Sequence, residues 1–225
     1  MQGKHTAYSG VKMKKVLLVA LLGLGAVCLN GANLTSEQFK QLAVSCLGDE
    51  NKISCQKFIY NGLLSVEQCD KTNCAGIGSA YRIVGDYEQT IKYYQRAGKL
   101  GDGLGYNNLG ILYEKGLGVK QNFFEAFKFY KKACELNVRA CYNLAVAYHN
   151  GTGTKQDFAS AKRHYESACD ANEGSACTNL GVLYAYGQGV KQDKSSAKKY
   201  HRKGCNLGDK VGCDNYRILN NQGVN

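Results

Sequence analysis

The feature that most constrains the fold is a segment that recurs three times at a nearly constant spacing. The copies NLGILYEKGLGVKQN (108–122), NLAVAYHNGTGTKQD (143–157) and NLGVLYAYGQGVKQD (179–193) superpose at steps of 35 and 36 residues. Each is followed by a second related block: FFEAFKFYKKAC, FASAKRHYESAC or KSSAKKYHRKGC. A fixed period in this range indicates an array of stacked two-helix units.

Both blocks have the periodicity of helices. In the first block of 108–122, Leu109, Leu112 and Tyr113 recur at helical spacing, and Gly116 and Gly118 can adopt positive φ and end the helix. The second block begins where a residue that caps a helix N-terminus is needed, and its small and aromatic residues make an inner stripe. The expected caps are Asn122 (with Glu125 as a capping box), Asp157 and Asp193; the stripe comprises Ala126, Phe127, Tyr130 and Ala133.

The rest of the chain divides around this array. A shorter copy at 74–98 aligns Tyr81 with Tyr113, and GCDNYRIL (212–219) begins another first helix. We therefore predict a repeat array over 74–219 and a tail at 220–225. Residues 34–73 look helical but have almost lost the repeat pattern, so we expect them to form a degenerate N-terminal cap.

The consensus NLG-x-x-Y-x-x-G-x-G-V-x-x-D-x-x-x-A-x-x-x-Y-x-x-A resembles the Sel-like repeat, a relative of the tetratricopeptide repeat. With cysteines closing each unit, the chain resembles the Helicobacter cysteine-rich protein (Hcp) family over about residues 74 to 219. The resemblance implies an all-α fold, a right-handed superhelical solenoid of antiparallel helix pairs. It also implies a secreted or periplasmic protein that interacts with a host and binds penicillins or weakly hydrolyses β-lactams.

The N-terminus has the pattern of an export signal. Lys12, Lys14 and Lys15 precede the apolar run VLLVALLGLGAVC, which is too short for a spanning helix. We predict a signal peptide at 1–28 and a secreted or periplasmic product of Gram-negative type; the alternative is lipidation of Cys28. This segment contains four lysines and no acidic residue, so its removal lowers the net charge from +11 to +7. Because the basic residues are dispersed, we expect no nucleic-acid partner and membrane contact only through the signal.

Ten cysteines remain after cleavage, an even number that suits an oxidised, exported protein. A local scheme joins the end of one unit to the start of the next, whereas a long scheme joins Cys141 to Cys169 and Cys177 to Cys205. In the shorter repeat the equivalent positions are Gly98 and Tyr106, so both members of a local pair are missing together. This favours the local scheme, with the pairs Cys134–Cys141, Cys169–Cys177 and Cys205–Cys213, and we expect Cys46–Cys55 and Cys69–Cys74 as well.

These cysteines do not have the sequence pattern of a metal or redox site. Their spacing is longer than C-x2–4-C, C-x-x-C is absent, and no histidine stands at matching repeat positions beside the pairs. We therefore predict that the cysteines form structural disulfide bonds, with no metal and no cofactor. The three histidines of the array, His149, His164 and His201, share no repeat position and are expected on the solvated surface.

A β-lactam activity would need a nucleophilic serine. Ser-x-x-Lys occurs as SCQK (54–57), SSAK (195–198) and SAKK (196–199), but Ser-Asp-Asn and Lys-Thr-Gly are absent. Ser54 and Lys57 are therefore weak catalytic candidates, and an enzyme is supported by the family resemblance alone.

Binding residues are predicted on the first helices. Asn108, Asn143, Asn179 and Asn215 share one repeat position and would line the concave groove of the solenoid. Such a row of amides can bind the backbone of an extended peptide or an extracellular host protein; alternatively, each asparagine bonds the neighbouring repeat. The predicted face also includes Arg139, Tyr142 and Tyr186. The leading hypothesis is an interaction protein, ahead of an enzyme acting on β-lactams or cell-wall peptides and of a purely structural array.

Overall fold

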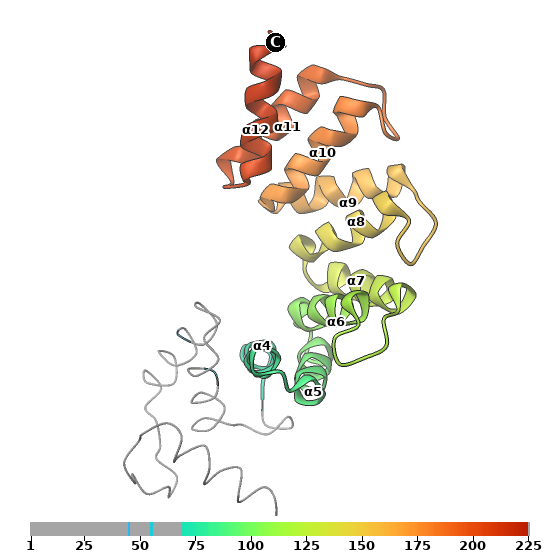
Figure 1. Cartoon of the computed structure of the whole chain (residues 1–225), viewed down its shortest axis with the longest axis vertical. Coiled ribbons are helices and arrows are strands. Elements are labelled where there is room, and N and C mark those ends of the chain that lie inside the picture. The colour runs from blue at the N-terminus through green and yellow to red at the C-terminus, as the bar shows by residue number, and fades with distance from the viewer. Residues whose placement is uncertain (1–44, 46–54, 56–68, 225) are drawn as a thin grey trace, which may run out of the picture.

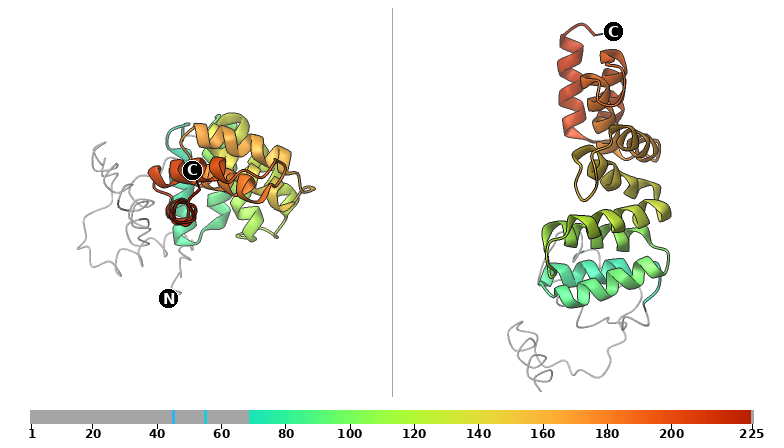
Figure 2. Two further views of the ribbon diagram at one scale, coloured as in Figure 1. Left: turned by 90° about the horizontal axis from the view of Figure 1, so that it is seen from above. Right: turned by 90° about the vertical axis from the view of Figure 1, so that its right-hand side faces the viewer.

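The computed structural model describes residues 45, 55 and 69–224, and in this part of the chain all regular structure is helical (Figure 1). The first helices of the repeats are α4 (Cys74–Val84), α6 (Gly103–Lys115), α8 (Cys141–Asn150), α10 (Gly174–Tyr186) and α12 (Lys210–Asn221). The second helices are α5 (Tyr87–Lys99), α7 (Phe123–Leu136), α9 (Phe158–Asp170) and α11 (Lys194–Asn206), and the 3-10 helix η1 (Val138–Ala140) leads into α8. The helix pairs stack along one long axis (Figures 1 and 2), which confirms the predicted solenoid. No helix among these residues has the length and apolarity needed to cross a bilayer.

An aromatic pair holds the two helices of each repeat together. A tyrosine near the end of the first helix stacks on a ring in the middle of the second helix, at centroid distances typical of offset stacking. The four pairs are Tyr81–Tyr93 at 5.3 Å, Tyr113–Phe129 at 5.4 Å, Tyr148–His164 at 5.7 Å and Tyr184–Tyr200 at 5.5 Å.

The glycine of the NLG motif allows the two helices to approach closely. A Cβ atom at Gly110 would overlap the ring of Tyr130, and one at Gly181 would lie 2.7 Å from the ring of His201. Larger side chains at these positions would push the second helix away from the first. In these two repeats the glycine is therefore a packing contact between the helices, whereas Ala145 occupies the same position in the repeat between them.

The two glycines of each Gly-x-Gly loop have different roles. Gly116 has a φ of 68° and ends α6. Gly118 also has positive φ, but its missing side chain makes room for Tyr87, at the start of α5 in the preceding repeat. The same contact joins Gly153 to the start of α7 and Gly189 to the start of α9. The second glycine thus joins successive repeats as well as turning the chain.

The second helices begin at the predicted caps. The Asn122 side chain accepts hydrogen bonds from the backbone N–H groups of Phe124 and Glu125. The reciprocal half of the predicted capping box is wrong, because the Asn122 N–H donates to the Tyr113 carbonyl and Glu125 pairs with Lys128. The same backbone bond and side-chain cap recur at Asp157 and Asp193.

Disulfide bonds connect the end of each unit to the start of the next in the local arrangement. In the three regular repeats the bridges span the turn from a second helix to the following first helix, with Cα separations of 4.3 to 4.7 Å. Cys55 is disulfide-bonded, and Cys46 lies outside the described residues. The bridges are Cys69–Cys74, Cys134–Cys141, Cys169–Cys177 and Cys205–Cys213.

An aromatic cluster stands where the shorter repeat lacks a bridge. The Tyr106 ring lies against Gly98, where a Cβ would be only 2.5 Å from the ring. Tyr106 also stacks on Phe129 at 6.0 Å, and Lys132 Nζ lies 5.4 Å from its ring centroid. Apolar and cation–π contacts therefore connect α5, α6 and α7 at this junction.

The prediction that the histidines are solvated is wrong for His201, which is 2% exposed. It occupies the repeat position of Tyr130 and Tyr165, so it points inward as those tyrosines do. Burial lowers the pKa of His201, and likewise those of the partly buried His149 and His164.

Candidate functional site

The predicted row of asparagines lies half-buried on α6, α8, α10 and α12. Asn143 Nδ2 donates to Asn107 Oδ1 of α6 at 2.7 Å, and Asn179 Nδ2 donates to the Tyr165 hydroxyl of α9 at 3.4 Å. The Asn108 amide interacts with the Tyr94 hydroxyl of α5. Burial raises the pKa of Tyr94, and this interaction with Asn108 lowers it in part. Three of the four asparagines therefore contact the preceding repeat. Since a carboxamide has two N–H donors and an acceptor oxygen, these bonds use only part of its capacity.

The other predicted binding residues differ in their exposure to solvent. Arg139 is exposed, and its Nε donates to the Ala171 carbonyl at 3.0 Å. Tyr142 is half-buried against Tyr165, with 6.1 Å between ring centroids, and burial raises its pKa. Tyr186 is 73% exposed at the last position of α10. It follows Asn179 by seven residues, two helical turns, so the two side chains share a face.

The hydroxyl groups of three buried second-helix tyrosines contact polar side chains of the first helices. Burial raises the pKa of these three tyrosines, so their hydroxyl groups remain protonated at physiological pH. The contacts are Tyr94 with Ser79, Tyr130 donating to Glu114, and Tyr165 with His149 Nδ1.

The serine candidates do not form a serine–lysine pair in the described part of the chain. The Ser196 hydroxyl donates to Asp193 at 2.6 Å, as part of the cap of α11. Lys198 Nζ donates to the Val224 carbonyl. Ser54 and Lys57 lie outside the described residues, so the structure places neither of them.

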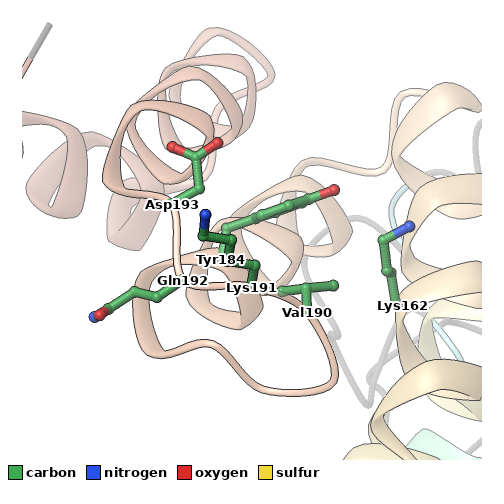
Figure 3. A pocket seen from close by; sticks show the side chains of 6 residues that line it. All are labelled: Lys162, Tyr184, Val190, Lys191, Gln192 and Asp193. Carbon is green, nitrogen blue, oxygen red and sulfur yellow. The ribbon is translucent and has the colours of Figure 1, made fainter.

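A small open pocket lies between α9 and the loop that joins α10 to α11 (Figure 3). Its volume is about 530 Å³. Lys162 stands on one side and is paired with Glu166 at 2.8 Å. Two ammonium groups, a phenol, an amide and the Asp193 carboxylate surround an apolar wall, so the lining carries charges of both signs. The lining residues are Lys162, Tyr184, Val190, Lys191, Gln192 and Asp193.

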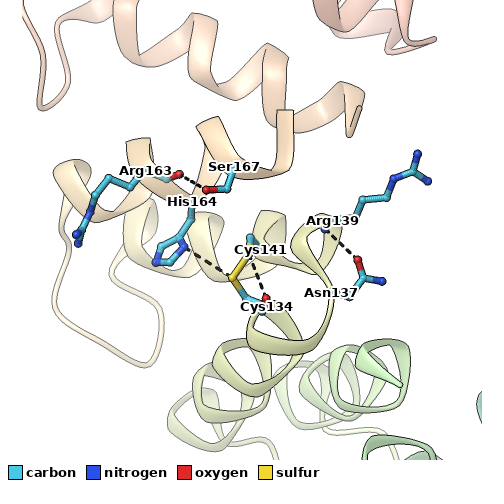
Figure 4. The surroundings of a disulfide bond; sticks show 7 residues. All are labelled: Cys134, Asn137, Arg139, Cys141, Arg163, His164 and Ser167. Atoms are coloured by element: carbon cyan, nitrogen blue, oxygen red, sulfur yellow. Dashed lines mark hydrogen bonds between the residues drawn. A yellow bond between two sulfur atoms is a disulfide. The ribbon is translucent and has the colours of Figure 1, made fainter. Parts of the chain in front are cut away.

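One disulfide has a histidine beside it (Figure 4). His164 Nδ1 lies 3.8 Å from Cys134 Sγ, and the ligand atoms of Cys134, Cys141 and His164 all lie within 4.8 Å of one another. No histidine stands at the matching position of the flanking repeats, but in this one repeat His164 lies beside the cysteine pair. His164 was missed because it is 30 residues from Cys134 in the sequence. His164 occupies the repeat position of Phe129 and Tyr200 in the flanking repeats. An alignment of the repeats therefore shows a histidine in place of an aromatic ring, and this replacement could have marked His164 as unusual.

Comparison with known proteins agrees with the division into helix pairs. The family model of the Sel1 repeat matches residues 75–102, 103–138, 138–173 and 174–209, which is more than half of the chain. The chain belongs to the Sel1 repeat family. Each Sel1 repeat corresponds to one helix pair, from α4–α5 to α10–α11.

Solved structures and one curated protein are similar to this Sel1 repeat protein. A Sel1 repeat protein from Oxalobacter formigenes is 23% identical, with a TM-score of 0.63 over 77% of this chain and 71% of the other. Cysteine rich protein B of Helicobacter pylori is 31% identical over 58% of this chain and 96% of its own, with a TM-score of 0.47. The DAP3-binding cell death enhancer 1 of Rattus norvegicus is 43% identical over 51 residues, 23% of this chain and only 10% of its own length.

Sel1 repeat proteins generally mediate protein–protein interactions. The disulfide bonds between the Sel1 repeats are typical of proteins outside the reducing cytoplasm.

Proposed function

We propose that this Sel1 repeat protein binds an extended segment of a protein partner along the first-helix face. This face comprises Asn108, Asn143, Asn179, Asn215 and Tyr186, with Arg139 and Tyr142 at its edge. The partner is an extracellular or host protein, and the chain acts after export through its predicted signal segment.

The observation that carries this proposal is the recurrence of partly exposed amides whose orientation is held by the preceding repeat. Asn143 is fixed by Asn107, and Asn179 by Tyr165. Because side-chain entropy has already been lost in these bonds, less is lost when the remaining donor and acceptor groups bind a peptide backbone. Amides spaced by one repeat would contact successive parts of an extended segment without depending on its sequence.

Tyr186 supplies the apolar contact that a row of amides lacks. Tyrosine buries a large area at low entropic cost and is common among the residues that dominate interface energies. Its high exposure and its position two turns from Asn179 support its use as an anchor.

Peptide-display selection with the oxidised mature chain, followed by calorimetry on the selected peptides, tests this function. We expect the combined substitutions Asn143→Ala and Asn179→Ala to lower the affinity for the selected peptides at least about tenfold, because two contacts with the peptide backbone are lost. The matched control is Asn206→Ala, which removes an exposed asparagine from the end of α11. Equal affinity in all three proteins would contradict the proposal, and an acyl adduct on Ser54 after incubation with a β-lactam would support the enzymatic alternative.

A further inference from the structure

The Cys134–Cys141 bridge differs from the other two bridges of the regular repeats in its surroundings. Beside it, His164 is stacked on Tyr148 with an interplanar angle of 7°, which holds the imidazole edge toward Cys134 Sγ. Beside the Cys169–Cys177 bridge, Tyr200 occupies the position of His164. Among the described residues, this is the one group of three histidine, cysteine or carboxylate side chains close enough to share an ion.

We propose that Cys134, Cys141 and His164 form a zinc site that is closed by oxidation and opened by reduction. A thiol reductant supplies two electrons and two protons to the disulfide, which becomes two thiols while the reductant becomes a disulfide. Zn²⁺ then displaces one proton from each thiol and binds both sulfur atoms and His164 Nδ1. In the reverse direction a disulfide oxidant accepts two electrons from the two thiolates and, with two protons from water, becomes two thiols, while the Cys134–Cys141 bond forms again and Zn²⁺ is released.

The geometry needs little change to hold the ion. With Zn–S of about 2.3 Å and Zn–N of about 2.0 Å, sulfur and nitrogen ligands on tetrahedral zinc are about 3.5 Å apart. The Cys134–His164 separation of 3.8 Å is already close to this value. The main movement is the separation of the two sulfur atoms to about 3.8 Å, which the same tetrahedral geometry requires.

The surroundings also suit a divalent cation. Two thiolates neutralise Zn²⁺, so the partly buried site would carry no net charge. Cys134 is partly exposed whereas Cys141 is 4% exposed, so solvent reaches the site from the Cys134 side and can supply the fourth ligand. The guanidinium of Arg163, the residue before His164 on α9, points away from the sulfur atoms (Figure 4).

The first test measures zinc binding by the reduced and oxidised full chain, using calorimetry and cobalt substitution as a spectroscopic probe of thiolate ligands. The reduced protein is expected to bind one equivalent, and the oxidised protein none. The variant His164→Tyr introduces the residue of the next repeat. We expect it to lower the affinity for zinc at least about tenfold. Equal affinity of the reduced wild type and this variant would overturn the proposal.

A second test identifies the cysteines that bind, and it remains decisive if reduction loosens the fold. The reduced chain is alkylated with and without Zn²⁺, and the labelled cysteines are identified by peptide mass mapping. Zinc is expected to slow alkylation of Cys134 and Cys141 at least about tenfold more than that of Cys169 and Cys177. Equal protection of the two pairs would show unspecific thiolate binding and would overturn the assignment.

Discussion

His201 occupies a position that is tyrosine in the preceding repeats, but it does not make the hydrogen bond that those tyrosines make. Tyr130 and Tyr165 have polar partners for their hydroxyl groups, whereas His201 Nδ1 has no hydrogen-bond partner among the described residues. An unpaired buried polar atom of this kind destabilises the fold by about 1–3 kcal/mol. His201 therefore contributes packing but marks a weak point of the last complete repeat.

The same residue makes stability depend on pH. Burial lowers the pKa of His201 below its ordinary value of 6.5, so the unfolded chain binds the proton more readily than the folded chain. The stability is present above about pH 6.5 and is lost as the pH falls below that value. His149 and His164 shift in the same direction and add to the effect.

Replacing the histidine with the tyrosine of the neighbouring repeats tests this explanation. His201→Tyr is expected to raise the midpoint of thermal unfolding by a few degrees at pH 5, and by less at pH 8, because it removes the protonation penalty and the unpaired nitrogen. The change in midpoint is measured by thermal unfolding, followed by circular dichroism at the two pH values. The reciprocal Tyr165→His variant should lose stability, most of all in acid; a gain that is the same at both pH values would contradict the role of protonation.

At the scale of the elements, the chain uses two kinds of junction between one helix pair and the next. A disulfide joins the regular repeats, and the Tyr106 ring against Gly98 takes the corresponding place in the shorter repeat. The two junctions occupy the same position in the repeat, so the missing bridge should be restorable.

The double substitution Gly98→Cys with Tyr106→Cys is expected to form a new disulfide spontaneously in oxidising conditions. Loss of Tyr106 removes its contacts with Phe129 and Lys132, which offsets part of the roughly 2–3 kcal/mol that a short bridge contributes. Thiol titration and intact mass detect the bridge, and Tyr106→Cys alone is the control. Free thiols in the folded double variant would show that the two junctions are not equivalent.

In the whole molecule, stability should be local, because each helix pair packs mainly on its neighbours in the stack (Figure 1). Replacing Cys169 and Cys177 by alanine is expected to cost about 2–5 kcal/mol. Hydrogen exchange should speed up in α9 and α10, on either side of the lost bridge, and remain unchanged in α4 and α5. Uniform acceleration along the chain would mean that the array unfolds as one cooperative unit.

The sequence was most informative where residues recur. Helix boundaries could be predicted because Gly116, Asn122 and their equivalents repeat at fixed positions, and the local disulfide pairing because Gly98 and Tyr106 depart from the pattern together. The contact of His164 with Cys134 could not be read from the sequence, since it depends on how one helix pair packs against the next. The burial of His201 follows from its repeat position, which buried tyrosines occupy in the two preceding repeats, and residue type alone does not indicate it. The intramolecular partners of the asparagines also needed three-dimensional geometry.

Binding of a partner to the first-helix face can be measured by hydrogen exchange with and without a selected peptide. We predict that bound peptide protects α6, α8 and α10, which carry Asn108, Asn143 and Asn179, while the second helices α7, α9 and α11 exchange as in the free protein. Protection confined to the second helices, or to the loops that join them to the first helices, would contradict the claim.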